Sequence, residues 1–412
     1  MQTAQQADYR RQAMHRLPLH VFRSGTSRGA LFLERDLLAV PSSSSSLEKT
    51  CVEDGGGPED ASSRLERLCA RVVGSGHPYA VDGVGGGRSS TMKSLYIRES
   101  ALPDCDVECR FVQSRVESFG VDLSHGDCGN MAASIGPFAI ERGLVAPSSG
   151  ENSTSVRVLS MNTGTRYKIR CETTDDGAVR YAGTATISGV EGHAAPVSVI
   201  AENPAGSVLG RLLPTDATVD VVPLDGKQVR VSCVDFVRPM VLFLAEDLGM
   251  TGAETKAECD ANEDLMARVE VLRQKAAVVM GMGDVTNAAS PKIAALSPPK
   301  AAPAGGGAIE VGVRYFTEPF NCDLHYAIAL TAAQCIGAAA TIPGTLAAPV
   351  EGGGEGEGRS ANGGEVEVVL RHPSGATSVY ITLGAKDGMP TSSRYVRTVR
   401  PIVQGHAFYP IV

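Results

Sequence analysis

Several features that mark other classes of protein are missing from this sequence. It has no tryptophan, and no apolar run approaches the length of a membrane span. No secretory apolar segment opens the chain, so we expect a cytoplasmic protein with reduced thiols and no membrane contact. Three arginines among the first sixteen residues suggest a mitochondrial location as the alternative.

Positive charge is also scarce. The 38 Lys and Arg residues stand against 46 Asp and Glu residues, which leaves a net charge of −8. This balance disfavours a nucleic-acid partner and gives no long-range attraction for anionic substrates. Any site for an anion must therefore be built locally, from backbone amides and a few Lys or Arg side chains.

Metal-binding patterns are missing as well. The ten cysteines include no pair separated by two residues, and Cys105 and Cys109 have no histidine nearby. We therefore expect no metal site.

Glycine is abundant, with 46 residues, and short alternating stretches recur along the chain. Together they predict many tight turns and a sheet-rich fold. Low-complexity stretches rich in serine, glycine and acidic residues predict two disordered inserts. We expect a disordered tail at residues 1–16. An N-terminal domain at 17–210 would contain the insert 42–63, and a C-terminal domain at 211–412 would contain the insert 350–364. The last strand could return to the N-terminal domain.

The stretch around Cys128 joins a polar turn to an apolar segment. Cys128, Gly129 and Asn130 lead into residues that leave almost no polar face, and Gly143 is placed as a helix stop. This pattern predicts a buried helix from 128 to 142 with Cys128 at its N-terminus. Free amides there favour a thiolate or a bound carboxylate. A structural cysteine beside a helix start is the alternative.

A similar succession of strand, polar turn and small-residue helix occurs at residues 309–337. Cys322 lies in its turn, at a place comparable to that of Cys128, and the helix is predicted from residue 324. The similarity suggests two like-folded halves that face each other across a cleft.

Two glycine-containing turns offer further candidates. Gly83, Gly85, Gly86 and Gly87 fall within five positions, and because glycine costs backbone entropy, they suggest amides that face a ligand. Lys93 follows on a predicted strand, where a desolvated lysine could act as acid or base and a solvated lysine is the alternative. The second turn, at residues 24–29, offers a hydroxyl and a guanidinium for a carboxylate, although a polar hairpin turn has the same pattern.

Four stretches taken together resemble the PrpF family. They are Arg23-Ser-Gly-Thr-Ser-Arg-Gly29, Asp82-Gly-Val-Gly-Gly-Gly87 followed by Lys93, Cys128-Gly-Asn130 leading into Gly136-Pro-Phe-Ala-Ile-Glu141, and Arg397-Thr-Val-Arg400. The resemblance runs from about residue 17 to the C-terminus, outside the two inserts. It implies an α+β fold of two pseudo-symmetric halves similar to diaminopimelate epimerase. Each half would be a mixed, largely antiparallel sheet around a buried central helix, with the active site between the halves.

The resemblance also implies an activity. Members of the family shift the position or geometry of a double bond in small di- and tricarboxylic acids of the aconitate and methylaconitate type, without a metal or an organic cofactor. Lys93 and Cys128 match the family's acid/base candidates. Lys292 is the best cationic candidate of the second half, with a surface loop lysine as the alternative. We expect the substrate's carboxylates to contact Ser27, Arg28, Gly85, Gly86, Gly87, Gly129, Asn130 and Lys292.

Two other functions stay open. A two-cysteine amino-acid racemase would use Cys128 and Cys322, although Cys322 lacks the glycine that follows the second cysteine of such enzymes. A non-catalytic relative would bind carboxylates or assist a partner dehydratase. We also expect a homodimer, and the long serine and glycine inserts favour a fungal source and a role in a secondary pathway.

Overall fold

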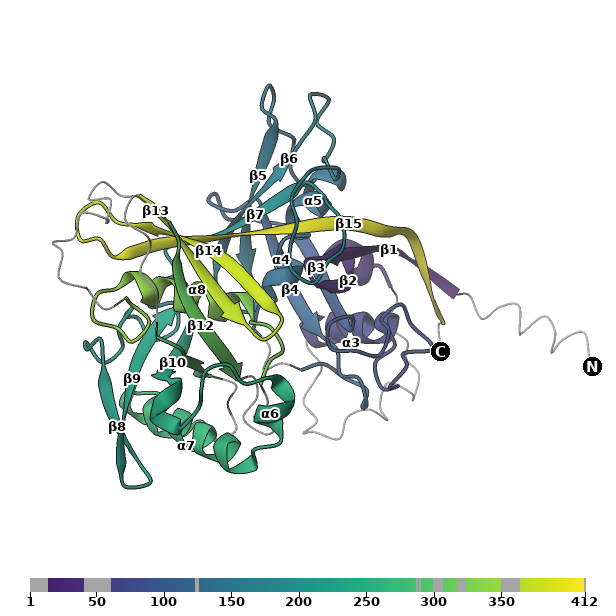
Figure 1. Cartoon of the computed structure of the whole chain (residues 1–412). Coiled ribbons are helices and arrows are strands. Elements are labelled where there is room, and N and C mark those ends of the chain that lie inside the picture. Colours follow the sequence, from purple (N-terminus) through teal and green to yellow (C-terminus); the bar gives the residue numbers. More distant parts are fainter. Residues whose placement is uncertain are drawn as a thin grey trace, which may run out of the picture.

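Strands are the commonest regular elements and, in the part of the chain that the structure describes, join into one continuous sheet (Figure 1). This computed structural model describes residues 14–40, 61–122, 126–286, 288, 290–298, 307–316, 324–349 and 364–410. The sheet-rich α+β class predicted from the sequence is confirmed.

The first half of the chain contributes seven strands to a closed ring. Its elements are β1 (Met14–Ser24), β2 (Ser27–Leu33), α2 (Glu34–Leu38), α3 (Ala61–Val73), β3 (Lys93–Glu99), β4 (Val107–Gln113), α4 (Gly129–Ala132), α5 (Ile135–Glu141), β5 (Ser153–Ser160), β6 (Arg166–Glu172) and β7 (Pro196–Glu202). Each strand pairs with the next, and the β2–β3 and β4–β5 pairs are parallel. The last strand, β15 (Pro390–Pro410), closes the ring by pairing with both β7 and β1.

The second half forms an open run of strands that ends on the same β15. Its elements are β8 (Asp220–Leu224), β9 (Lys227–Phe236), β10 (Arg238–Leu244), the 3₁₀ helix η2 (Ala245–Leu248), α6 (Lys256–Asp260), α7 (Glu263–Val279), β11 (Lys292–Leu296), β12 (Ile309–Phe316), α8 (Leu330–Thr341), β13 (Glu365–His372) and β14 (Gly375–Leu383). From β9 to β15 the order of antiparallel and parallel pairings is the same as from β1 to β7. In Figure 1, β15 runs across the whole molecule from β14 to β1.

A buried helix lies against the inner face of each run. α5 contacts β5 and β6, whereas α8 contacts β9, β10 and the strands from β12 to β15. One continuous apolar cluster holds both helices and includes Phe138 of α5 and Ile336 of α8. Separate outer clusters lie under α3 and α7. The centre of the molecule is therefore where the two inner faces meet.

The helix predicted from 128 to 142 is broken into α4 and α5. Pro137 has no amide hydrogen to donate to the carbonyl four residues before it, and its ring crowds that carbonyl. The chain turns more tightly instead, and the Ser134 amide donates to the Met131 carbonyl at 3.0 Å. α5 ends at Glu141 and Gly143 follows with a φ of +69°, so the predicted helix stop is confirmed.

The second buried helix begins later than predicted. α8 starts at Leu330, while Leu324 forms an isolated bridge with Phe316, and the helix continues through Gly337 to Thr341. Cys322 lies outside the described residues, but in the sequence it precedes the helix N-cap, Ala329, by seven positions. Cys128 is itself the N-cap of α4. Whether Cys322 occupies a place comparable to that of Cys128 therefore stays a prediction.

Two predicted segment boundaries also move. β1 begins at Met14, inside the predicted tail, and α3 begins at Ala61, inside the first predicted insert. Residues 1–13, 41–60 and 350–363, which hold the rest of these predictions, lie outside the described residues. Among the described residues, no helix has both the length and the apolar character needed to cross a membrane.

The short helix α4 and the buried helix α8 meet at their first residues, Gly129 and Leu330. A Cβ atom on Gly129 would lie 2.7 Å from the Cβ of Leu330 and 3.0 Å from the Tyr395 hydroxyl. These separations are shorter than ordinary van der Waals contacts, so the absence of a side chain at Gly129 permits the close approach of α4 and α8.

We predict that Gly129→Ala lowers the free energy of unfolding by about 1–3 kcal/mol, the usual cost of overpacking a core. Gly405→Ala is the matched control, because a Cβ at that position of β15 would meet no atom within 4 Å. Urea unfolding of both variants measures the difference. Equal stability of the two variants would contradict the close contact.

Candidate active site

Lys93 is a buried lysine at the first position of β3. Its side chain is 7% exposed, and its ammonium donates a hydrogen bond to the Gln113 amide oxygen at 2.6 Å. The ammonium also lies 5.2 Å from the centre of the Phe111 ring. Among the described residues, no carboxylate forms an ion pair with Lys93, so its described contacts are a neutral amide and an aromatic face. The strand and the burial predicted for this lysine are confirmed.

Gln113, the last residue of β4, fixes the direction of the Lys93 side chain. Its amide nitrogen donates to the carbonyls of Ser89 and Met92 at 3.2 and 3.1 Å, which leaves the amide oxygen pointing at the lysine. A neutral acceptor can receive a hydrogen bond from either protonation state of lysine. The sequence analysis missed Gln113, because its contact with Lys93 depends on the pairing of β3 with β4.

Cys128 is the N-cap of α4, and hydrogen bonds to the backbone of the residues that follow it hold its turn in place. Its side chain is partly exposed, and its carbonyl accepts the amide hydrogen of Ala132 at 2.9 Å. The Tyr395 hydroxyl donates to the Gly129 carbonyl at 2.9 Å, and Ser24 donates to the Asn130 carbonyl at 2.5 Å. The turn that carries the thiol is thus tied to both β15 and β1.

Asp127 anchors the same turn from the other side. Its carboxylate accepts hydrogen bonds from the hydroxyls of Thr163 and Tyr167 at 2.6 and 2.7 Å, and from Ser160. Burial, together with the nearby carboxylate, raises the pKa of Tyr167 well above its ordinary value, so this phenol stays a donor. Asp127 therefore acts as a fixed support for Cys128.

The glycine loop before Lys93 packs closely against the end of α3. A Cβ on Gly83 would lie 2.2 Å from the Gly74 nitrogen, and a Cβ on Gly87 would lie 1.9 Å from the Pro78 carbonyl oxygen. The Gly85 amide donates to the Val73 carbonyl at 3.1 Å. A contact between the Gly85 amide and a carboxylate, as predicted from the sequence, would require this bond to break.

Arg28 lies against the glycine loop. Its guanidinium donates to the Gly85 carbonyl, and the same group lies 2.8 Å from the position of a Cβ on Gly86. Its buried Nε has no hydrogen-bond partner in the described part of the chain. Ser27, one residue earlier, is buried at the start of β2 and pairs with Ser24 across the hairpin. The structure thus brings together the two small-residue turns that the sequence singled out.

Lys292 is buried at the first position of β11 and is 8% exposed, so the alternative of a surface loop lysine is wrong. It aligns with Met240 of the parallel neighbour β10, just as Lys93 aligns with Gly29 of β2. Side chains alternate along a strand, and the alternate residues after each lysine belong to the central cluster: Leu95, Ile97, Ala294 and Leu296. Both lysines therefore lie on the inner faces of their runs.

A cavity of about 280 Å³ lies beside these residues, between the two halves of the chain. Gln113, which binds Lys93, lines it, and so do Gly126, two residues before Cys128, and Ser290, two residues before Lys292. Lys93 and Cys128 themselves are not among the described residues that line it. Lys93, Cys128 and Lys292 are therefore connected to the cavity through lining residues, by a hydrogen bond or by two positions of sequence, and do not line it themselves.

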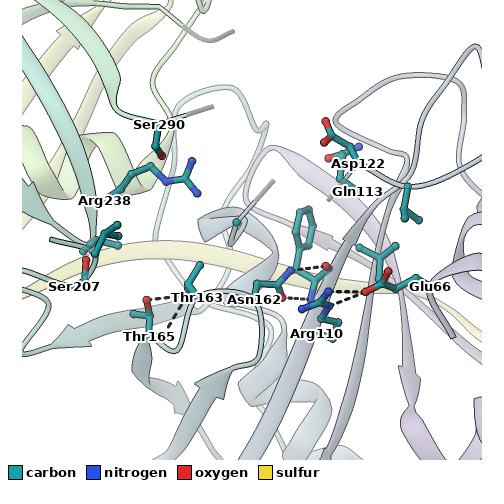
Figure 2. Close-up of a pocket in the computed structure, with 16 residues that line it drawn as sticks. Glu66, Arg110, Gln113, Asp122, Asn162, Thr163, Thr165, Ser207, Arg238 and Ser290 are labelled. Atoms are coloured by element: carbon teal, nitrogen blue, oxygen red, sulfur yellow. Dashed lines mark hydrogen bonds and ion pairs between the residues drawn. The ribbon is translucent and has the colours of Figure 1, made fainter. Parts of the chain in front are cut away.

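Arg238 reaches into this cavity from the start of β10. Figure 2 shows its side chain in the space between Ser207 and Ser290 on one side and Gln113 and Asp122 on the other. Its guanidinium lies 2.2 Å from the position of a Cβ on Gly126, so the absence of a side chain there lets it pass.

No carboxylate in the described ranges forms an ion pair with Arg238. The sequence analysis missed this arginine. The only local signal was its place in a tight turn between two buried strands, where Val237 has a φ of +65°. A guanidinium in a cavity rich in hydroxyl and amide groups suits a carboxylate ligand.

Comparisons with known proteins agree over nearly the whole chain. The family model described as PrpF protein matches residues 14–410. The chain is 36% identical to a 4-oxalomesaconate tautomerase of Pseudomonas putida, with 95% of each chain covered. It is 33% identical to a 2-methyl-aconitate isomerase of Shewanella oneidensis, with 94% of this chain and 95% of the relative covered. These relatives are bacterial and give no support to the predicted fungal source.

The fold is similar to that of a solved isomerase. The crystal structure of a methylitaconate-delta-isomerase superposes with a TM-score of 0.74 at 29% sequence identity, and 97% of each chain is covered.

Proposed function

Because the chain belongs to the PrpF family, we propose that it is an isomerase that moves the double bond of a small unsaturated di- or tricarboxylic acid. The observation that carries this proposal is the buried Lys93–Gln113 pair beside a cavity that holds Arg238. A base next to a carboxylate-binding cation is what proton abstraction from such an acid requires.

In the proposed reaction, neutral Lys93 removes a proton from the allylic carbon of the acid. The electrons of the broken C–H bond form the new double bond, and the charge spreads onto the adjacent carboxylate. The proton then returns to the far carbon of the old double bond. Rotation about a carbon–carbon bond of the intermediate, followed by return of the proton to the carbon that it left, would give a cis–trans change instead. Only a proton moves and the oxidation level is unchanged, so the step needs no redox cofactor.

Gln113 supports Lys93 in both of its protonation states. Its amide oxygen accepts a hydrogen bond from the amine and from the ammonium, so the side chain stays in place while the proton is transferred. Cys128 would serve as the second acid or base, or hold the intermediate from its fixed turn beside Asp127.

Cations from both halves would bind the carboxylates. Arg238 offers a bidentate guanidinium in the cavity, while Arg28 lies on β2 and Lys292 on β11. The catalytic centre would then lie between two like-folded, pseudo-symmetric halves, each built around its own central helix. The predicted contacts from Ser27, Gly86, Gly87, Gly129 and Asn130 belong to this proposal.

Proton NMR in D₂O tests the proposed reaction. We expect the purified protein to shift the double bond of cis-aconitate, 2-methylaconitate or an itaconate-type acid, with deuterium entering the allylic carbon. A preparation treated with a chelator should react at the same rate, because only a proton is transferred. No shift and no deuterium uptake with any of these acids, while α-hydrogen exchange occurs in an amino acid, would replace the proposal by the racemase alternative.

A further inference from the structure

The segment that joins the two halves, residues 203–219, contributes one wall of the cavity that holds Arg238. Ser207 and Val208 line the cavity from this segment, and Figure 2 shows Ser207 on the same side of the cavity as Arg238. Val208 is 58% exposed, so packing of its side chain cannot fix this wall. The position of the wall must instead depend on hydrogen bonds to its backbone.

Asp235 of β9 binds this wall with its side chain. The carboxylate accepts the amide hydrogens of Val208 and Leu209 at 2.8 and 2.6 Å. It also accepts a hydrogen bond from the Ser207 hydroxyl at 3.2 Å. The side chain of Asp235 is fully buried. One carboxylate therefore fixes three consecutive residues of the joining segment, two of which line the cavity.

Backbone hydrogen bonds tie the same segment to the turn that carries Arg238. The Gly206 amide donates to the Asp235 carbonyl at 2.8 Å, and the Val237 amide donates to the Pro204 carbonyl at 3.0 Å. Arg238 follows Val237 directly and begins β10. The wall and the guanidinium are therefore held by one frame, which belongs to the second half of the chain.

The charge of Asp235 makes this frame resist displacement. Within the described residues, no Lys or Arg forms an ion pair with Asp235. Burial raises the pKa of its carboxyl, because no nearby cation offsets the desolvation. A move of the wall away from Asp235 would leave a buried carboxylate without hydrogen bonds, which is costly. The wall is therefore held firmly in one position.

We propose that Asp235 is a positioning residue that sets the width of this cavity, and thereby the affinity for the acid whose carboxylate binds Arg238. The inference rests on the proposed function for the assignment of the cavity to that acid. Among the described residues that line the cavity, Asp235 itself is not included. Without its carboxylate, Ser207 and Val208 would no longer stay at a fixed distance from Arg238. The KM for the acid would rise, whereas kcat would stay the same because proton transfer at Lys93 is unaffected.

Calorimetric titration with tricarballylate, a saturated tricarboxylate that has no double bond to move, measures affinity without turnover. We expect Asp235→Ala to bind it roughly ten- to hundredfold more weakly than wild type, a usual cost of misplacing a binding group. Asp235→Asn should bind nearly as well as wild type, because its amide oxygen can accept both amide hydrogens and its amide nitrogen can donate to Ser207. Asp220→Ala is the matched control, since Asp220 accepts a hydrogen bond from Thr215 of the same segment and neither residue lines the cavity.

A second pair of variants keeps the test decisive if Asp235→Ala folds poorly. A Cβ on Gly206 would lie 2.5 Å from the Arg211 backbone nitrogen, so Gly206→Ala should displace the wall. A Cβ on Gly210 would meet no atom within 4 Å, and both glycines have a positive φ, so Gly210→Ala is its control. We expect Gly206→Ala to bind tricarballylate more weakly than Gly210→Ala does.

Val208→Asp tests whether this wall faces the acid. A new carboxylate on the wall should repel those of tricarballylate and weaken its binding at least as much as Asp235→Ala does. Val221→Asp is the control, because Val221 of β8 is 55% exposed and lies outside the cavity.

The binding results separate the role of Asp235 from the proposed function. Wild-type affinity in Asp235→Ala and Gly206→Ala would overturn the proposal, and so would equal losses in Asp235→Ala and Asp220→Ala. If Val208→Asp alone weakens binding, the cavity remains the site for the acid and only the role of Asp235 fails. Absence of tricarballylate binding by wild type would overturn both that role and the assignment of the cavity. A lack of isomerase activity, with the expected binding results intact, would refute the proposed function instead.

Discussion

Replacing Lys93 with methionine is expected to lower the rate of double-bond migration by about 10²- to 10⁴-fold, the usual contribution of a positioned acid or base. Methionine keeps the length and the apolar stem of the buried side chain but cannot carry a proton. The same variant should incorporate no deuterium into the allylic carbon when the reaction is followed by NMR in D₂O. Substrate affinity should change little, since the carboxylates are bound elsewhere.

The loss of the Lys93–Gln113 hydrogen bond has a separate and smaller effect. An unsatisfied buried amide oxygen costs about 1–3 kcal/mol of stability, so the variant should fold but unfold at a lower urea concentration. Lys168→Met, on the partly exposed lysine of β6, controls for the loss of a lysine as such. Full deuterium uptake by Lys93→Met would show that Lys93 is not the base.

Replacing Cys128 with alanine is expected to lower turnover by about 10²-fold or more, if the thiol is the second acid or base. Alanine fits the N-cap backbone, and the bonds from Tyr395 and Ser24 go to backbone carbonyls, so the turn should persist. The measurement is steady-state turnover of the acid identified by NMR, together with binding of a saturated analogue. Unchanged turnover would assign Cys128 a structural role.

Cys322→Ser provides the comparison that separates isomerase from racemase. An isomerase that uses Lys93 and Cys128 should retain most of its activity in this variant. A two-cysteine racemase needs one thiol on each face of the substrate and should lose activity with either cysteine replaced. Equal losses from Cys128→Ala and Cys322→Ser would therefore favour the racemase.

The residues that the sequence placed correctly depend on local patterns. Lys93 begins a strand whose apolar residues start two positions later, and Cys128 precedes a helix whose composition shows its burial. The stop at Gly143 depends on the left-handed backbone that glycine adopts there. Each of these features is set by a few neighbouring residues, so the sequence alone contains it.

The residues that the sequence missed or misread depend on contacts between distant segments. Arg238 reaches its cavity because it passes Gly126, more than a hundred positions earlier, and no local pattern records that contact. Gly83 is crowded against Gly74, just after α3, and Gly87 against Pro78, whereas the sequence suggested that these glycines face a ligand; both uses of glycine look alike in sequence. For Lys292 the sequence left open a cationic site residue and a surface loop lysine, because a proline precedes it and its strand is only five residues long.

The course of β15 determines when the protein can fold as it is synthesised. The ring that surrounds α5 needs β15 between β7 and β1, yet β15 comprises residues 390–410. Until β15 has left the ribosome, one edge of β1 and one edge of β7 stay unpaired. Open strand edges pair readily with other chains, and such long-range closure is slow. The ring around α5 can therefore close only after β15 has been synthesised, and a chain truncated before β15 would leave this half prone to aggregation.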